Sequence, residues 1–409
     1  MRNYTRGRFL NFKRVPIPLL VTSLAVASAL LGDAMLYVVM PSTPERWDLT
    51  IVQVGILLSA NRFIRLVTNP MSAFCVEKFG IYNPFRITLI LSLLVLVIYA
   101  SSTSFTLLLI ARLLWGTCWS ILRLVSQWIA TDQSNDNNLG FNISSNASII
   151  RLGSIGGALF GGILSDFIGY RYALVIFMVF TVANYFSWTK TSTYSAVNTK
   201  PALSPRRNGF LLVLKNPRVL ALGISGLVVG LSFYGLLGAT LGHFLRFTFG
   251  DEFNLLAVTI GVASITGILL GFMSSSEVFI GPYAGLLSDK YGRIRTLIVS
   301  ASIFFIGLSL FGITGNIWII FFLLLLAFVG GVMLMMQLLV LVGVIAEGPQ
   351  KSDIFSTYNT FQDIGSAFGP FLGLSLINAE HLSTIYLFTG SLLYILIIGL
   401  CVYLNNIKK

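Results

Sequence analysis

Two stretches of the sequence decide the fold. Pro282 to Arg293 reads PYAGLLSDKYGR, and Pro70 to Ile81 reads PMSAFCVEKFGI, so a proline, an acidic residue, a lysine and a glycine recur 212 positions apart. The same offset relates two sets of three glycines: Gly153, Gly157 and Gly161, and Gly365, Gly369 and Gly373. Two separate blocks with one offset predict two homologous halves that carry the same elements in the same order.

The composition points to a membrane protein. The chain has 409 residues, of which 56% are hydrophobic and 10% charged, whereas soluble domains carry about 25% charged residues. Apolar runs long enough to cross a bilayer follow one another, and the backbone of such segments must be helical. No short alternating strands of the outer-membrane barrel kind are seen. We predict twelve transmembrane helices, at 17–41, 50–76, 85–103, 105–130, 141–165, 172–189, 218–247, 255–284, 295–314, 317–345, 356–377 and 384–404.

The predicted fold is therefore an all-α integral membrane protein built from two pseudo-symmetric six-helix bundles. We place an N-terminal tail at 1–16, the first bundle at 17–190, a polar linker at 191–217 and the second bundle at 218–409. In membrane proteins, duplicated halves are typical of transporters whose substrate path runs between them.

The net charge of +12 reports topology. Basic residues cluster before the first helix, between the halves, around 290–295 and at the C-terminus. With twelve spans all of these lie on one side of a cytoplasmic or plasma membrane, and the positive-inside rule makes that side cytoplasmic, with both termini there. We expect no nucleic-acid partner. The basic start followed by an apolar run also resembles a signal peptide, but that run continues to Met40 and its removal would break the six-plus-six count.

Other classes of protein receive little support. Three cysteines and two histidines show no metal-ligand spacing, and no phosphate-binding loop is present. We therefore expect no metal, no cofactor and no direct use of ATP. A membrane enzyme would need a catalytic constellation, and a sensor would carry a soluble output domain. Neither is visible, and two complete halves predict a functional monomer in the lipid bilayer.

The duplicated stretch resembles a motif of the major facilitator superfamily, and the resemblance covers essentially the whole chain. GLLSDKYGR, from Gly285, is similar to that family's loop motif between helices two and three and its repeat between helices eight and nine. The first copy is degenerate, because Ala73 and Ile81 replace a glycine and an arginine. The resemblance implies loops that gate the cytoplasmic side, through a carboxylate near a helix N-terminus. The gating residues would be Glu77, Lys78, Gly80, Gly285, Asp289, Lys290, Gly292 and Arg293.

Two further patterns resemble the drug:proton antiporter branch of that family. GSIGGALFGG, from Gly153, is similar to the glycine motif of the fifth antiporter helix, with Ala158 where the motif has proline. The second half carries that proline as Pro370, after Gly369. Arg112 to Gly116 resembles the antiporter pattern RxxxG. Helix packing alone would also explain the glycines, which are Gly153, Gly157, Gly161, Gly365, Gly369 and Gly373.

Ionisable residues inside the predicted helices are costly in a bilayer, so each suggests a function. We expect Asp33 to pair with Arg112 or Arg62. Arg112, Trp115, Trp119 and Arg123 recur at steps of three to four and form one stripe. Such a stripe could bind an aromatic or anionic substrate, or the tryptophans could merely pack while Arg123 reaches the cytoplasmic surface. The predicted substrate cavity comprises Arg62, Arg65, Arg112, Trp115, Trp119 and Arg151.

The repeat also predicts opposed charges between the halves. Subtracting 212 places Glu277 on Arg65 and Asp363 on Arg151. We hypothesise that Arg65 meets Glu277 and that Arg151 meets Asp363 across the interface; the alternative is that each charge is satisfied within its own bundle.

Proton coupling requires a group that gains and loses a proton as its surroundings alternate. The candidates are Asp33, Glu277, Asp363 and His243. The expected function is secondary transport by alternating access, with proton-coupled efflux of small organic molecules such as drugs or hydrophobic metabolites. The alternative is transport of an organic anion, because five embedded arginines accompany one aspartate in the first half.

Overall fold

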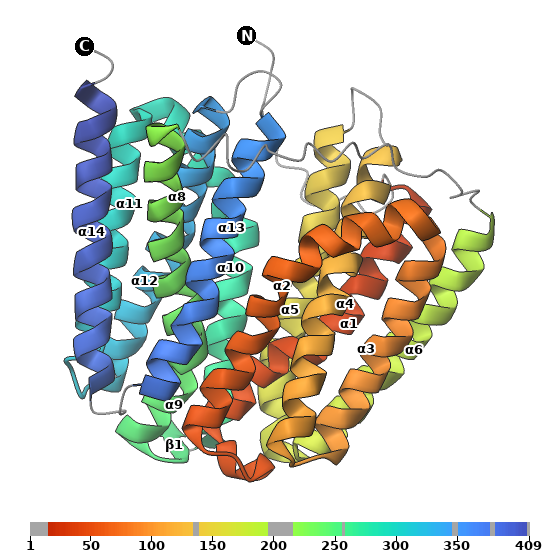
Figure 1. The fold of residues 1–409 in the computed structure, drawn as a ribbon. Helices are drawn as coiled ribbons and strands as arrows, with labels where there is room; N and C mark the ends of the chain where they lie inside the picture. The colour runs from red at the N-terminus through yellow and green to blue at the C-terminus, as the bar shows by residue number, and fades with distance from the viewer. Residues whose placement is uncertain are drawn as a thin grey trace.

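The computed structural model describes residues 15–133, 139–194, 216–255, 258–345, 351–376 and 381–406. Most of the predicted tail and most of the predicted linker lie outside these residues. Figure 1 shows the helices standing side by side in two groups. The first group comprises α1 (Ile17–Ser42), the short 3-10 helix η2 (Pro44–Trp47), α2 (Ile51–Phe79), α3 (Tyr82–Ser101), α4 (Phe105–Asp132), α5 (Leu139–Phe167) and α6 (Tyr170–Tyr194).

The second group repeats this order with interruptions. It comprises α8 (Pro217–Val229), the π-helical η3 (Gly230–Leu237), α9 (Gly238–Phe249), strands β1 (Glu252–Leu255) and β2 (Val258–Gly261), α10 (Val262–Tyr291), α11 (Arg293–Leu310), α12 (Ile317–Ile345), α13 (Lys351–Pro370), the π-helical η5 (Phe371–Leu376) and α14 (Leu382–Asn406). The two groups are the two six-helix bundles that the sequence predicts.

The helices are long enough for a membrane. Among the described residues, eleven helical segments are long and apolar enough to span a bilayer, and one of them is the continuous run Pro217–Phe249 made of α8, η3 and α9. The twelfth span is α13 with η5, which carries Asp363 in its middle and packs between the halves against α2 and η3. Its polar side chains make it less apolar than the other spans.

Two elements differ from the prediction. The helix expected at 218–247 contains the π-helical turn η3, and the helix expected from 255 begins only at Val262. An antiparallel hairpin precedes it, with Glu252 paired to Gly261 and Leu255 to Val258. The apolar run that β2 shares with the start of α10 is too short to be told from a helix start by periodicity.

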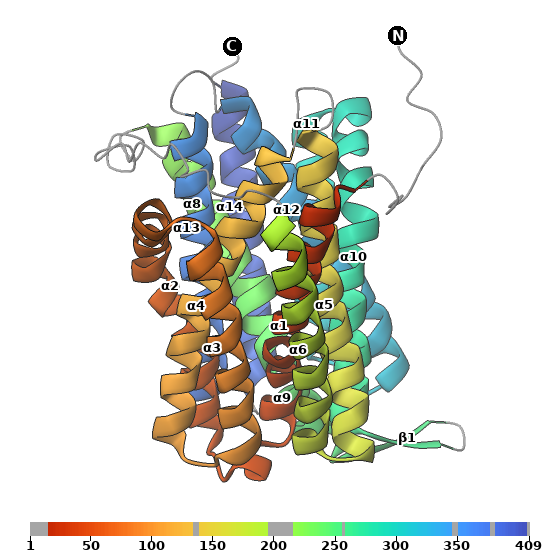
Figure 2. The same cartoon turned by 90° about the vertical axis from the view of Figure 1, so that its right-hand side faces the viewer.

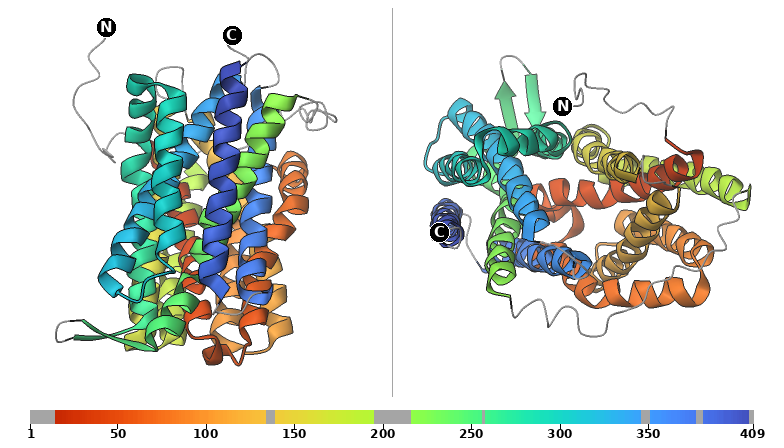
Figure 3. Two further views of the ribbon diagram at one scale, coloured as in Figure 1. Left: turned by 90° about the vertical axis from the view of Figure 1, so that its left-hand side faces the viewer. Right: turned by 90° about the horizontal axis from the view of Figure 1, so that it is seen from above.

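The bundle has two faces, named here by what they carry. The terminal face is the one at which α1 begins and α14 ends, and the hairpin face carries η2 and the β1–β2 hairpin (Figure 2). Between the halves, α5 packs on α10, α2 packs on α13 and η5, and α1 packs on α9 and α10. Figure 3 shows this arrangement from above, with the helices grouped around the interface.

The halves are in close contact near the hairpin face. A side chain at Gly162 of α5 would collide with the Ala263 carbonyl of α10, and one at Gly55 of α2 would meet the Pro370 carbonyl. The Ser375 hydroxyl also donates to the Val52 carbonyl at 3.0 Å. Small residues therefore let the two halves close at this face.

The repeated glycines pack helices within each half. A methyl group at Gly153 or Gly157 of α5 would collide with the α1 carbonyl of Ala27 or Leu31, and Gly161 faces Met35. In the second half, Gly365, Gly369 and Gly373 of α13 and η5 face Leu227, Gly235 and Thr240 in the same way. The spacing found in the sequence is thus a close helix crossing, used twice.

Candidate substrate cavity

A cavity of about 430 Å³ lies between the halves. A second space of about 150 Å³ shares Asp33, Arg62, Arg151 and Tyr234 with it and extends to Glu277 of α10. We call the two together the central cavity. Its lining reaches Ala130 and Asn146, near the ends of α4 and α5 at the terminal face. Because the halves are closed at the hairpin face, the central cavity faces the terminal face.

The buried pair in its wall joins α1 to α4. Asp33 forms an ion pair with Arg112, whose side chain is 0% exposed, while that of Asp33 is 13% exposed. Nε of Arg112 donates to the Leu57 carbonyl of α2 at 2.9 Å, and Asn61 donates its amide to Asp33 at 3.2 Å. The predicted contact of Asp33 with Arg112 is confirmed. Arg112 itself lies behind the wall and lines neither space of the cavity.

Arg62 is held differently, by neutral oxygen atoms. Its Nε donates to the Tyr37 hydroxyl at 3.1 Å, and its Nη1 donates to the Ser366 carbonyl of α13 at 2.9 Å. In a regular helix that carbonyl would accept from residue 370, but Pro370 has no N–H. The proline therefore frees an acceptor that Arg62 uses, across the interface between the halves.

The inter-half ion pair differs from the predicted ones. Arg151 of α5 pairs with Glu277 of α10, and the Tyr234 hydroxyl of η3 hydrogen-bonds with both. The carboxylate that acts on Arg65 is Asp363. The hypotheses that Arg65 meets Glu277 and that Arg151 meets Asp363 are therefore wrong for this conformation.

The helix packing explains why the observed ion-pair partners differ from the predicted ones. Residues related by the repeat occupy equivalent helices, α2 with α10 and α5 with α13, and these lie diagonally across the interface. The helices that face each other are α5 with α10 and α2 with α13. A repeat offset identifies symmetry mates, whereas an ion pair requires neighbours.

The α4 stripe also contributes to the cavity wall. Trp115, Trp119 and Arg123 line the cavity, with the two indole rings 6.2 Å apart between centroids. Arg65, Arg151 and Asp363 also line it. His243 lies in α9, outside the lining of both spaces and next to Arg246, so the structure does not bring it together with the other proton-coupling candidates.

The predicted gating loops lie at the terminal face. Gly80 and Gly292 end α2 and α10 with φ of +74° and +92°, a conformation that favours glycine. Lys78 lies near the Phe79 ring and Lys290 near the Tyr291 ring, while Arg293 begins α11. Gly285 belongs to α10, and the side chains of Glu77 and Asp289 lie outside the described part of the structure.

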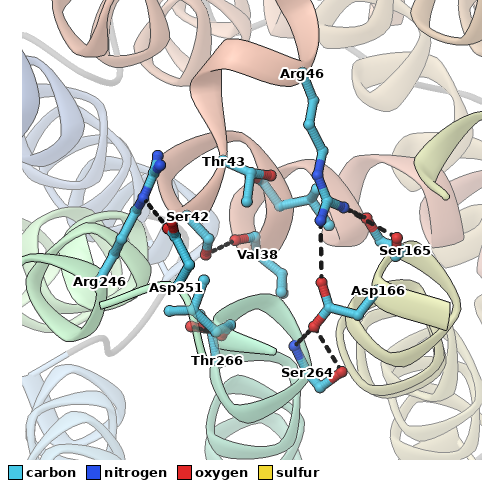
Figure 4. A network of polar contacts seen from close by, with 12 residues as sticks. Val38, Ser42, Thr43, Arg46, Ser165, Asp166, Arg246, Asp251, Ser264 and Thr266 are labelled. Carbon is cyan, nitrogen blue, oxygen red and sulfur yellow. Dashed lines mark hydrogen bonds and ion pairs between the residues drawn. The ribbon is translucent and has the colours of Figure 1, made fainter. Parts of the chain in front are cut away.

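At the hairpin face, polar contacts join the halves (Figure 4). Asp166, at the end of α5, accepts from the Ser264 backbone N–H at 2.7 Å and hydroxyl at 2.8 Å, at the N-terminus of α10. Arg46 of η2 donates to the Ser165 hydroxyl at 2.7 Å and pairs with Asp166 at 3.3 Å. These contacts fasten α5 to α10 through a carboxylate at a helix N-terminus.

A second link at this face is centred on Arg246 of α9. It pairs with Glu45 of η2 at 2.6 Å and with Asp251 at 2.6 Å. Sequence reasoning did not identify these links, because their partners are far apart in the chain.

Tyr37 and Tyr234 were also missed as cavity residues. Tyr37 lies four residues after Asp33, on the same face of α1, and this spacing could have identified it. Tyr234 had no such signal, because it lies in the π-helical η3, where helical spacing changes.

Comparisons with known proteins agree with this geometry. The model of the Major Facilitator Superfamily matches residues 22–276 and 270–408. The multidrug resistance protein MdtG of Dickeya zeae is 28% identical over 255 residues, 59% of each chain. The synaptic vesicular amine transporter of Mus musculus is 28% identical over 123 residues, 29% of this chain and 23% of that one. The matched regions thus span less than two thirds of these relatives.

Solved structures show the same fold. A bacterial homolog to the human lysosomal transporter Spinster, in an inward-facing and occupied conformation, aligns with a TM-score of 0.72 at 14% identity, over 94% of this chain and 95% of that one. The nucleoside transporter NupG, solved as a point mutant, aligns with a TM-score of 0.75 at 14% identity, over 94% and 100%. The family model covers nearly the whole chain, and this chain belongs to the major facilitator superfamily.

Proposed function

We propose that this transporter exports small organic molecules by alternating access and that proton binding at Asp33 drives the cycle. The observation that carries the proposal is the buried Asp33–Arg112 pair in the wall of a cavity that is closed at the hairpin face. The similarity to proteins named for multidrug resistance supports export of organic molecules.

Orientation follows from charge. Among the described residues, basic side chains at helix ends lie mainly at the terminal face, and the positive-inside rule assigns that face to the cytoplasm. These residues are Lys78, Lys190, Arg218, Lys290, Arg293 and Arg295. The central cavity would then face the cytoplasm, where an exporter collects its substrate.

Asp33 is suited to couple a proton to this movement. It touches both the cavity and Arg112, so a rearrangement of α1 against α4 changes its counter-ion and its contact with water. Either change alters how readily a carboxylate takes up a proton. Glu277 is the second candidate, because its partner Arg151 belongs to the other half and must move when the halves do.

The test is transport in proteoliposomes with an imposed pH gradient and a pH-sensitive dye inside. Organic cations, neutral drugs and organic anions are added in turn to the wild type and to Asp33→Asn. The matched control is Asp132→Asn, which neutralises an exposed carboxylate at the end of α4. Variants are first checked for a monodisperse profile in detergent.

We expect substrate-triggered proton movement in the wild type and in the control, and none in Asp33→Asn. Substrate movement that depends on neither the gradient nor Asp33 would overturn the proposed coupling.

A further inference from the structure

The charges around the central cavity do not cancel. Three arginines have a carboxylate as electrostatic partner. Arg112 forms an ion pair with Asp33, Arg151 forms one with Glu277, and Asp363 attracts Arg65 electrostatically. For Arg62 and Arg123, which both line the cavity, the described residues include no ion-pair partner. Counted over the described residues, the cavity is therefore left with two positive charges.

From this imbalance we infer that the substrate is an organic anion with an aromatic body, and that Arg62 binds its anionic group. The inference rests on the proposed function only in taking the central cavity as the substrate path.

The hydrogen bonds of Arg62 leave it available to an anion. Both of its acceptors, the Tyr37 hydroxyl and the Ser366 carbonyl, are neutral. A carboxylate or phosphonate adds a full negative charge beside the guanidinium, and its two oxygens match the planar guanidinium. An entering anion would therefore replace these neutral acceptors, or share the N–H donors of Arg62 with them.

Neighbouring charges favour the same occupant. Arg62 and Arg123 both repel the like charge of Arg65, and all three guanidinium groups line the same cavity. Within the described residues, Asp363 is the one carboxylate that acts on Arg65 beside them. A substrate anion offsets this repulsion, whereas a substrate cation increases it.

The proton site stays separate from this anion site. Arg112 is fully buried behind Asp33 and does not line the cavity, so an anion on Arg62 leaves Asp33 its counter-ion. Proton and substrate can then be tested independently.

Aromatic side chains line the space beside Arg62. The Tyr37 ring lies 5.2 Å from its guanidinium carbon, and Trp115 and Trp119 line the same cavity. Flat indole and phenol surfaces favour an aromatic ligand through stacking and edge-to-face contacts. A volume of about 430 Å³ suits a single small molecule.

The test uses ligands that differ only in charge. Naphthyl, indolyl and biphenyl bodies are each offered as the carboxylate, the carboxamide and the primary amine, and binding to the purified full chain is measured by equilibrium dialysis. The proteins compared are the wild type, Arg62→Gln, Arg62→Lys and the control Arg86→Gln. Arg86 lies in α3 against the Tyr82 ring and does not line the cavity.

We expect the carboxylate of at least one body to bind at least tenfold more tightly than its amide or amine. Arg62→Gln should remove about 10- to 100-fold of that affinity, as expected for a charge-assisted pair, and should leave amide binding unchanged. Arg62→Lys should retain part of it, and Arg86→Gln should match the wild type.

Tighter binding of the amines, equal binding of all three forms, or no binding by any compound would overturn the inference. The transport assay distinguishes a failure of this inference from a failure of the proposed function. Arg62-dependent binding of carboxylates without proton movement would contradict only the coupling, and proton-coupled transport of amines would contradict only the anion.

Discussion

At the scale of single residues, Asp33 and Arg112 depend on each other. Arg112 is fully buried and has Asp33 as its only ion-pair partner in the described structure. Removing one member of a buried pair leaves an uncompensated charge, which costs about 3–5 kcal/mol, whereas removing both is often far less harmful.

We therefore predict that Asp33→Leu alone lowers the unfolding temperature in detergent more than the double variant Asp33→Leu/Arg112→Leu. Scanning calorimetry or thermal fluorescence of the purified variants measures this. Effects that simply add would mean that the two side chains are not coupled.

The partner of Glu277 can be tested by exchanging charges. Reversing one charge in the Arg151–Glu277 pair should abolish transport, and the double exchange Arg151→Glu/Glu277→Arg should restore part of it, because the two side chains touch across the interface. The matched control is Arg65→Glu/Glu277→Arg, which should not recover. Recovery of the control instead of the first pair would favour the pairing expected from the repeat offset alone.

At the scale of elements, small residues set how closely the halves approach. Gly162 of α5 and Gly267 of α10 each face a backbone carbonyl of the other helix, those of Ala263 and Ala158. A larger side chain at either glycine cannot be accommodated without separating α5 from α10.

Gly267→Leu should therefore open the hairpin face, which can be measured as faster thiol labelling of a cysteine placed at Ser264, near the start of α10. The control is Gly399→Leu in α14, where an added side chain meets open space. Unchanged labelling in Gly267→Leu would show that this crossing does not hold the face closed.

The helices and strands also show which features could be predicted from the sequence. The twelve spans, the two halves, the glycine crossings and the Asp33–Arg112 contact were predictable, because hydropathy, repeat spacing and helical periodicity determine them. The hairpin β1–β2 was not, because its strands are only four residues long and β2 runs directly into the apolar start of α10. The partner of Arg151 could not be predicted either, because a repeat offset identifies symmetry-related positions and not neighbouring side chains. Pro370 could have pointed to the freed Ser366 carbonyl, but not to Arg62 as its donor.

At the scale of the whole molecule, the proposed alternating access requires the polar links at the hairpin face to break. Asp166 ties the N-terminus of α10 to the end of α5, and Arg246 ties α9 to Glu45. The Arg246–Glu45 pair is largely exposed, and exposed ion pairs are worth about 0–1 kcal/mol each, so this pair biases the equilibrium between conformations without fixing it.

Asp166→Asn should shift that equilibrium toward opening at the hairpin face by roughly 2- to 10-fold, because it weakens both the contact with Arg46 and the cap on α10. The shift is measured from distance distributions between spin labels on the two halves. Asp132→Asn, at the opposite face, serves as the control and should leave the distribution as in the wild type.

The most direct test of the proposed mechanism is whether the two faces open and close reciprocally, and whether this depends on Asp33. In a variant without Cys75, Cys118 and Cys401, spin labels at Ser101 and Ile313 report the hairpin face, and labels at Lys190 and Val402 report the terminal face. Distances are measured by pulsed electron resonance across a pH series in nanodiscs, with and without Asp33→Asn. Alternating access coupled to Asp33 predicts that one distance lengthens as the other shortens, and that the substitution abolishes this pH response. Distances that stay constant, change together, or respond equally without Asp33 would contradict it.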